Sequence, residues 1–348
     1  YGDHRDLHSL RRRQRQMCIR DRHYTGKKIL ITGGAGCIGS NLTKALLKAD
    51  PEKIIIIDDL SAGHEWLIPK DGRIFFIKGS ILDEEKMKRA FSFKPQYVFH
   101  LAAHFANQNS VDHPETDLLV NALGTLRTLE YANLTSVERF VFASSGCSVY
   151  GSNAPLPLRE DFISLHLDTP YQINKLIGEL YCNYFHDYYG LPIAIARYFN
   201  VYGPGEVPGK YRNVIPNFMW WAMNGKPLPI TGTGNETRDF TFVDDIIDGT
   251  LRMGVVKEAI GEAINLASGR ETKIIDLAKM INDITGNKAG IVFKPRRSWD
   301  KAVRRRASID KARKILGYDP KTDIRDGLIK VYEWFSENLE NIKKSIKF

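Results

Sequence analysis

Residues 28–39 have the sequence KILITGGAGCIG, in which a short apolar run leads into evenly spaced glycines at 33, 36 and 39. The run predicts a buried strand, and the apolar positions that recur from Ile38 to Leu46 predict a helix. The glycines therefore lie in a strand-to-helix turn, where backbone amides and the helix dipole can hold a pyrophosphate. The spacing GxxGxxG alone is also compatible with a tight structural turn.

The next apolar run, residues 53–57, predicts a second strand and ends at Asp58. An acid at this position can accept hydrogen bonds from both hydroxyls of an adenosine ribose, and it would repel a 2′-phosphate. Strand, glycine turn, helix, strand and acid in this order predict a dinucleotide-binding unit that takes NAD rather than NADP.

A second group of residues predicts proton transfer. Thr169 and Pro170 suit the cap and first residue of a helix, and Tyr171 and Lys175 then share one of its faces. A phenol with a pKa of about 10 is a poor base at neutral pH. A nearby ammonium favours the phenolate, and an oxidised nicotinamide would add to that effect. With Ser145 and the glycine turn, the pair predicts a base that deprotonates a hydroxyl while hydride leaves the same carbon; alone, it is compatible with an exposed helix face.

Five further apolar runs predict strands, and helical patterns separate them. The runs are short and lack polar alternation, as strands that are covered on both faces do. They comprise residues 73–77, 97–101, 139–143, 193–196 and 263–266. Their alternation with helices predicts an α/β fold with a doubly wound parallel sheet, similar to a Rossmann fold.

From about residue 26 to about residue 330, the chain resembles the extended short-chain dehydrogenases/reductases of the NAD-dependent sugar-nucleotide epimerase/dehydratase family. Besides the motifs above, the matching segments are residues 100–103, 121–125, 149–151, 197–204, 238–240 and 316–318. The resemblance implies an NAD-binding domain of residues 26–200 plus 238–268. It also implies a smaller, discontinuous sugar-nucleotide lobe of residues 201–237 plus 269–348, and a homodimer that pairs the helix of Tyr171 and the helix before it with their copies.

The resemblance also implies a set of cofactor-binding positions. They are Gly33, Gly36, Cys37, Ile38, Asp58, Asp59, Leu60, Ser61, Gly63, Ser80, Ile81, Leu101, Ala102, Ala103, Asn121, Ser144, Tyr171, Lys175 and Tyr198. Ser80 departs from the family pattern, in which an Asp binds the adenine amino group. A serine there can still accept one uncharged hydrogen bond, so NAD remains the expected cofactor.

The catalytic serine is a second departure from the family. Counted forward from Phe142 in the predicted strand, the family position falls on Ser145; counted backward from the motif at 149–151, it falls on Gly146. An insertion is better tolerated in a turn than in a buried strand, so Ser145 is the expected residue. Ser144 and Ser148 are the alternatives.

The same turn favours one chemistry. Family 4,6-dehydratases carry an Asp-Glu pair directly after this serine or threonine, and family decarboxylases carry a Glu nearby, whereas residues 146–148 contain no carboxylate. Elimination needs its own acid and base. We therefore expect C4 epimerisation of a nucleotide-diphosphate sugar, UDP-linked, with Ser145, Tyr171 and Lys175 as catalytic residues. The alternatives are an epimerase of a UDP-uronate or deoxysugar nucleotide, a decarboxylase or dehydratase, and a catalytically silent NAD- and nucleotide-binding module.

Substrate-binding positions follow from the resemblance. Ser145 is implied to bind the sugar where it assists Tyr171. Asn200, Arg238, Arg297 and Asp300 are implied to hold the diphosphate and ribose, and Val214, Pro229 and Ile230 are implied to line the base. Guanidinium groups suit phosphate because their donors match its oxygens. Surface salt bridges and lobe packing are the alternative roles. His104, Asn107 and Gln108 are expected near the sugar, and Arg304, Arg305 and Arg306 are expected to form a solvated basic face rather than a carboxylate clamp.

The composition of the 348 residues excludes several classes of protein. No apolar run approaches the ~20 residues of a membrane span. The four cysteines have no metal-ligand spacing, so we expect no metal and reduced thiols in a cytoplasmic protein. The net charge is +9, but residues 1–22 contain seven Arg and three Asp and lack an apolar segment. We expect residues 1–25 to be a non-native or disordered extension rather than a targeting peptide or a nucleic-acid-binding arm.

Overall fold

The computed structural model of the protein describes residues 22–348, so most of the extension predicted for residues 1–25 lies outside the described residues. Tyr24 is described and is buried. Its hydroxyl donates a hydrogen bond to the carbonyl oxygen of Leu251 at 2.8 Å, and its ring packs edge-on against Tyr97. The packed part of the chain therefore includes Tyr24, inside the segment that was expected to be an extension.

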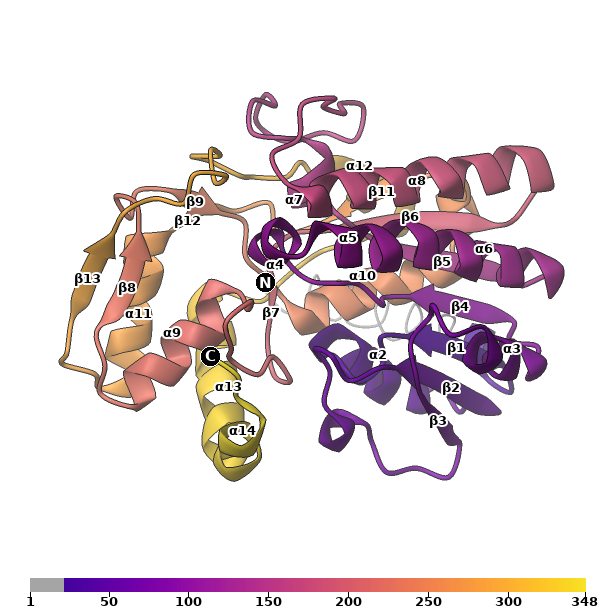
Figure 1. The fold of residues 1–348 in the computed structure, drawn as a ribbon, viewed down its shortest axis with the longest axis horizontal. Coiled ribbons are helices and arrows are strands. Elements are labelled where there is room, and N and C mark those ends of the chain that lie inside the picture. Colours follow the sequence, from indigo (N-terminus) through magenta and orange to yellow (C-terminus); the bar gives the residue numbers. More distant parts are fainter. Residues whose placement is uncertain (1–21) are drawn as a thin grey trace, which may run out of the picture.

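A seven-stranded parallel sheet in the order β11-β6-β5-β4-β1-β2-β3 confirms the predicted doubly wound α/β fold (Figure 1). Its strands are β1 (Lys28–Thr32), β2 (Lys53–Asp58), β3 (Ile74–Lys78), β4 (Tyr97–His100), β5 (Arg139–Ser145), β6 (Ile193–Tyr198) and β11 (Ala263–Leu266). All seven correspond to predicted runs. The strands β5 and β6 extend two residues beyond their predicted ends because Ser144 and Ser145 pair with Arg197 and Tyr198.

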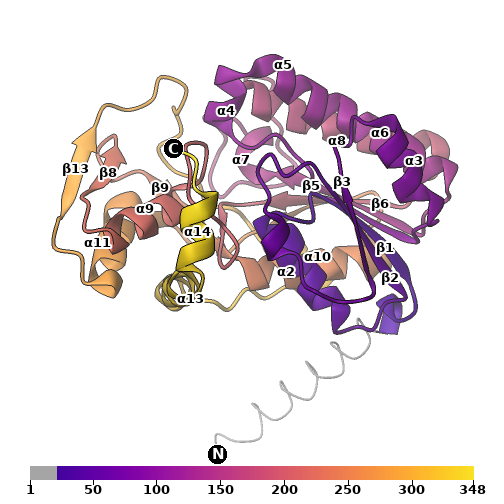
Figure 2. The same cartoon turned by 60° about the horizontal axis from the view of Figure 1, so that its bottom comes forward.

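Helices cover both faces of this sheet (Figure 2). The helices α2 (Cys37–Leu47) and α10 (Val243–Val255) lie on one face, and α3 (Glu84–Ser92), α6 (Gly124–Leu134) and α8 (Pro170–Tyr189) lie on the other. The central strands are apolar on both sides, so each face buries its own hydrophobic cluster. This explains why the strand sequences lack polar alternation.

Short elements occupy the connections of the large domain. The segment between β4 and α6 forms α4 (Asn107–Asp112), α5 (Pro114–Asp117) and η2 (Leu118–Leu123). The turn after β5 forms α7 (Gly146–Val149), and the loop after β2 contains η1 (Glu65–Leu67). Near the end of the domain, β7 (Val201–Tyr202) pairs with β10 (Thr241–Phe242), and η3 (Lys257–Ala259) precedes β11.

The smaller lobe lies beside the carboxyl ends of the strands, at the left of Figure 1. It contains α9 (Val214–Met223), β8 (Leu228–Thr231), β9 (Thr237–Arg238), β12 (Thr272–Lys273), α11 (Ile274–Thr285), β13 (Ile291–Lys294), α13 (Ile324–Glu337) and α14 (Leu339–Ser345). The helix α12 (Asp310–Leu316), although it falls in the segment expected to form this lobe, instead packs beside β11. Lys311 fixes it there by donating a hydrogen bond to the carbonyl oxygen of Ala263 at 2.8 Å.

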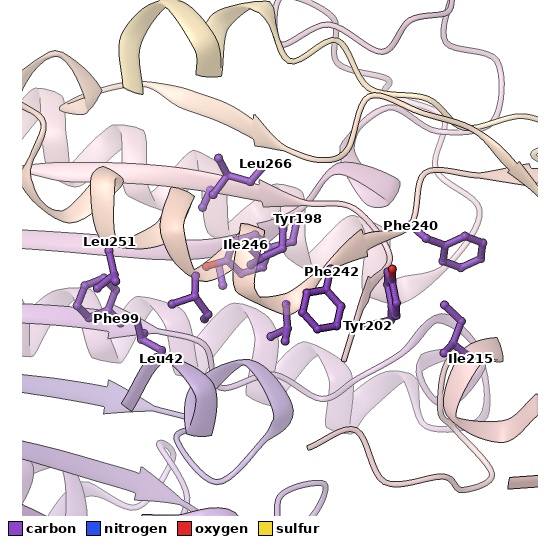
Figure 3. Packing of buried hydrophobic residues seen from close by; sticks show 14 of the residues in the cluster. Leu42, Phe99, Tyr198, Tyr202, Ile215, Phe240, Phe242, Ile246, Leu251 and Leu266 are labelled. Carbon is purple, nitrogen blue, oxygen red and sulfur yellow. The ribbon is translucent and has the colours of Figure 1, made fainter. Parts of the chain in front are cut away.

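An apolar seam joins the two parts of the molecule (Figure 3). Tyr202 packs edge-on against Phe242 and Phe240, with ring centroids 5.5 and 6.5 Å apart. Ile215 of α9 belongs to the same buried cluster as Leu42 of α2. The smaller lobe is therefore packed onto the large domain through a shared core. No helix in residues 22–348 is long and apolar enough to cross a membrane.

Candidate active site

A cavity of about 340 Å³ opens at the carboxyl edge of the sheet, facing the smaller lobe. Most predicted cofactor positions line it, together with two of the predicted substrate positions, Ser145 and Asn200. The cofactor positions that line it are Gly33, Gly36, Cys37, Ile38, Asp58, Asp59, Ser61, Gly63, Ser80, Ile81, Leu101, Ala102, Ala103, Ser144, Tyr171, Lys175 and Tyr198. The fold thus gathers residues as far apart in the sequence as Gly33 and Asn213 into one site.

The glycine turn packs its backbone closely against neighbouring backbone segments. Gly33 has φ +74°, and a Cβ there would lie 2.7 Å from the amide nitrogen of Ala102. A Cβ at Gly39 would lie 2.3 Å from the carbonyl oxygen of Gly33, so the first turn of α2 needs glycine for close packing. No side chain caps α2. Amides at the helix N-terminus are therefore available to a pyrophosphate, as the motif predicts.

Asp58 ends β2 with its carboxylate fixed by the backbone. One oxygen accepts a hydrogen bond from the amide of Ala35 at 2.9 Å, and the other accepts one from the amide of Leu60 at 2.8 Å. Burial raises the pKa of Asp58, and these two amide hydrogen bonds oppose the shift. The carboxylate is thus held in position at the cavity wall with lone pairs left for ribose hydroxyls.

Tyr171 and Lys175 lie on the first turns of α8, whose predicted cap is confirmed because Thr169 accepts a hydrogen bond from the amide of Gln172. The Nζ atom of Lys175 donates to the carbonyl oxygen of Ala143 at 2.9 Å and lies 5.9 Å from the centroid of the Tyr171 ring. Burial lowers the pKa of Lys175 from 10.5 to about 8. The ammonium is therefore close enough to the phenol to favour its ionised form.

The structure separates the three candidate serines. The hydroxyl of Ser144 donates to Glu179, whose carboxylate pairs with Arg197 through hydrogen bonds of 3.0 and 2.8 Å, so Ser144 belongs to a buried network. Ser148 is buried and is not among the cavity residues. Ser145, at the end of β5, lines the cavity together with Tyr171. Its assignment as the catalytic serine stays a prediction that this placement supports.

Gly146 follows Ser145 in a position that excludes a side chain. A Cβ at Gly146 would lie 1.8 Å from a ring carbon of Phe199, which is fully buried. Counting backward from residues 149–151 places the family's catalytic serine or threonine at this glycine. The clash of an added Cβ with Phe199 explains why neither residue fits there.

Two predicted cofactor residues do not line the cavity. Leu60 turns with φ +61° and donates its amide to Asp58. The amide group of Asn121 accepts a hydrogen bond from the backbone nitrogen of His104 at 2.9 Å and donates to its carbonyl oxygen at 3.1 Å. Both residues thus shape the wall of the cavity. His104 and Asn107 line it, whereas Gln108 accepts a hydrogen bond from the indole of Trp299.

The remaining predicted substrate residues lie in the smaller lobe, outside the cavity lining. Arg238 and Asp300 form an ion pair with N–O distances of 3.0 and 3.1 Å, and Arg297 packs over the ring of Trp299. Val214 begins α9, and Pro229 lies on β8. The side chain of Ile230 is fully buried in the core, so only its backbone can face a base. The substrate roles of these residues stay predictions.

The three consecutive arginines differ in their surroundings. Arg304 is exposed and pairs with Glu271 at 2.6 Å, as expected of a solvated basic face. Arg305 is 6% exposed and is buried instead. In residues 22–348, no group of three or more His, Cys, Asp or Glu side chains could hold a metal ion.

Among the cavity residues that sequence analysis missed are Glu206, Arg212 and Asn213. They lie in the Pro- and Gly-rich stretch between β7 and α9. Their only signal in the sequence is that they follow the matched segment 197–204 directly.

Comparison with known proteins identifies the family. Residues 29–267 match the model of the NAD dependent epimerase/dehydratase family. The protein belongs to this family and is an NAD-dependent enzyme of sugar-nucleotide metabolism. The glycine turn, the amides at the start of α2 and the fixed Asp58 carboxylate fit the phosphates and ribose of NAD.

Solved structures and curated relatives agree with this assignment. The epimerase Mth375 from Methanothermobacter thermautotrophicus is 60% identical, with a TM-score of 0.94 over 95% of this chain and 98% of that one. The enzyme WbmF from Bordetella bronchiseptica, solved with NAD+, is 35% identical, with a TM-score of 0.81 over 93% and 96% of the two chains.

Curated relatives differ in their reactions. A UDP-glucose 4-epimerase from Mycolicibacterium smegmatis is 35% identical over 88% of this chain and 98% of its own length. A UDP-N-acetyl-alpha-D-glucosaminuronate decarboxylase from Bacillus cytotoxicus is 33% identical over 90% and 99%. Identity therefore establishes the family, and the reaction has to be argued from the residues of the site.

Proposed function

We propose that the protein epimerises a nucleotide-diphosphate sugar at C4 and that its substrate is a UDP-linked hexose. The observation that carries this proposal is the group Ser145, Tyr171 and Lys175 at the cofactor cavity, without a carboxylate in the turn that follows β5. The carboxylates that line the cavity are Asp58, Asp59 and Glu206. Asp58 ends β2, Asp59 follows it, and Glu206 lies between β7 and α9, so none of the three belongs to the turn after β5.

Proton transfer is the task of the chain itself. Lys175 favours the phenolate of Tyr171, which removes the proton from the 4-hydroxyl, and Ser145 orients that hydroxyl. When bound, NAD supplies a reversible hydride acceptor for C4. The carbonyl oxygen of Ala143 holds the Lys175 ammonium at 2.9 Å and so keeps the cation beside Tyr171. The keto sugar has to rotate within the site so that C4 can regain hydride on its other face. Tyr171 then returns the proton to the 4-oxygen, which completes epimerisation.

The test is a panel of UDP-, dTDP-, GDP- and CDP-linked sugars, with the products identified by NMR. We expect a UDP-hexose to equilibrate with its C4 epimer, and deuterium placed at C4 to remain at C4, since hydride leaves and returns within one site. Carbon dioxide release, or accumulation of a 4-keto-6-deoxy sugar, would show a decarboxylase or a dehydratase instead. If the protein bound NAD and UDP but converted none of the sugars, it would be a catalytically silent NAD- and nucleotide-binding module.

The exposed face of α8 supports the homodimer. Leu180 is 57% exposed, and Tyr184 is exposed on the same helix, while Leu118 and Leu119 are exposed on the neighbouring η2. Large apolar side chains gathered on one face favour association. We expect a dimer by sedimentation at micromolar concentration and a monomer for Leu180→Glu. A wild-type monomer would contradict the proposal.

A further inference from the structure

The segment 203–213, between β7 and α9, places two ionisable side chains that proton transfer does not use in the wall of the cofactor cavity. Glu206 and Arg212 both line the cofactor cavity. The segment is anchored to the first turns of α2 because the carbonyl oxygen of Pro204 accepts a hydrogen bond from Asn41 at 2.8 Å. It therefore passes beside the helix N-terminus at which the glycine turn presents its amides.

Arg212 anchors the other end of this segment to the large domain. Its guanidinium donates a hydrogen bond to the carbonyl oxygen of Ala62, in the loop that follows β2. The same loop packs on the glycine turn, because the amide of His64 donates to the carbonyl oxygen of Ala35 at 2.9 Å. Arg212 thus reaches from the smaller lobe to the loop that lies against the pyrophosphate-binding turn.

The charge of Arg212 acts on both ends of the predicted phosphate and ribose site. Burial raises the pKa values of Cys37 and Asp58, and the positive charge of Arg212 opposes each shift. Cys37 is the first residue of α2, and Asp58 is the predicted ribose ligand. Arg212, Cys37 and Asp58 also line the same cavity, so the guanidinium shares its wall with the helix N-terminus and the ribose acid.

Glu206 provides a buried carboxyl group in the same wall. It is 6% exposed, and its Oε1 atom accepts a hydrogen bond from Asn213 at 3.1 Å. In residues 22–348, its Oε2 atom has no hydrogen-bond partner. Burial raises the pKa of Glu206 to about 7, and the charge of Arg212 opposes that shift most strongly. A carboxyl group of this kind limits the cost of holding a guanidinium in a partly buried wall.

We propose that Arg212 binds the pyrophosphate of NAD, so that the segment 203–213 is part of the cofactor site. A guanidinium has five N–H donors in a planar fork, and the contact with Ala62 leaves donors for phosphate oxygens. The pyrophosphate is then held by the amides of α2 and by a cation from the smaller lobe. This inference depends on NAD binding alone and not on the sugar that the enzyme converts.

The test compares adenine ligands that differ in their phosphates. Calorimetry on nucleotide-free protein would measure NAD, ADP, AMP and adenosine with the wild type, Arg212→Gln and Arg212→Lys. We expect Arg212→Gln to weaken NAD and ADP roughly tenfold to a hundredfold, since it removes charge-assisted hydrogen bonds. Adenosine, which has no phosphate, should lose nothing. Arg212→Lys should recover part of the ADP affinity, because it keeps the charge without the fork.

Arg304→Gln is the matched control, because Arg304 is an exposed arginine of the smaller lobe outside the cavity. It should leave all four affinities unchanged. If Arg212→Gln weakened the binding of ADP and adenosine equally, Arg212 would only hold the two lobes together. Unchanged ADP affinity in this variant would also overturn the proposal. If the variant is less stable, the ratio of the two affinities still decides, since both are measured on the same folded protein.

Discussion

The cofactor half of the active site and its sugar-nucleotide half are built from different parts of the fold. Gly33, Asp58, Ala102 and Ser145 lie at or just beyond the ends of strands of one parallel sheet, whose carboxyl ends meet at one edge. Apart from Ser145 and Asn200, the predicted substrate residues come from separate elements of the smaller lobe, and Arg238 is paired with Asp300. Sheet register thus places the first set, whereas lobe packing places the second. The cofactor half can stay constant while the substrate half changes.

The largest effect is expected at the junction of the two halves. Tyr171→Phe removes the base and keeps the ring, so turnover should fall about 10²- to 10⁴-fold while NAD and nucleotide affinities stay nearly unchanged. Steady-state kinetics and calorimetry would measure the two quantities. Tyr188→Phe, on the exposed end of the same helix, is the control and should keep full activity. Normal turnover in Tyr171→Phe would exclude this residue as the base.

A change in the cofactor half should affect NAD alone. Asp58→Ala removes the carboxylate that the amides of Ala35 and Leu60 hold. We expect NAD affinity to fall roughly tenfold to a hundredfold, and the preference for NAD over NADP to narrow, because charge-assisted hydrogen bonds are lost and repulsion of a 2′-phosphate ends. Calorimetry with both cofactors measures this, and Asp283→Ala on the exposed face of α11 is the control. If the wild type bound NADP more tightly than NAD, the assignment of Asp58 to the adenosine ribose would be wrong.

A change in the substrate half should affect the nucleotide alone. Arg238→Gln breaks the ion pair with Asp300 and removes a guanidinium predicted to hold phosphate. We expect UDP affinity to fall about tenfold with NAD affinity unchanged. Arg304→Gln controls for the loss of charge in the same lobe. An equal loss of UDP affinity and NAD affinity would mean that the two halves are not independent. Unchanged UDP affinity would mean that Arg238 serves only the packing of the lobe.

The smallest effect concerns the stability of the nucleotide-free protein. Burial lowers the pKa of Lys175 from 10.5 to about 8, so between these pH values the unfolded chain binds more protons than the folded one. Wild-type stability should therefore rise with pH in this window relative to Lys175→Met, by at most about 1.4 kcal/mol per pH unit. Urea denaturation at several pH values measures the difference. Lys279→Met, at an exposed site, should show no such trend, and a flat difference for Lys175→Met would contradict the burial argument.

The sheet was predictable because each strand carries its own signal. A strand covered on both faces must be apolar throughout, so the seven runs and their order identify a parallel sheet without any long-range information. Asp58 and Lys175 were predictable for a related reason, since each lies at a fixed offset from a local strand or helix start. The cap at Thr169 is equally local.

Other parts of the site depend on contacts between distant segments. Arg212 meets Ala62 across 150 positions, and Arg197 is buried against Glu179 and Ser144 from a neighbouring strand and helix. Neither arginine differs in sequence from a surface arginine. For Ile230 the sequence prediction placed the residue against the base, but its side chain is buried in the core. No local sequence pattern indicates the packing that buries it.

The contact between Gly146 and Phe199 limits which enzymes can descend from this one. A carboxylate directly after Ser145 would need a side chain at a position where an added Cβ would lie 1.8 Å from a ring carbon of Phe199. A single substitution there would disrupt the wall before any new reaction appeared. Two changes, at residues 146 and 199, would have to occur together. Descendants of this enzyme would therefore acquire a new sugar substrate more readily than a new reaction.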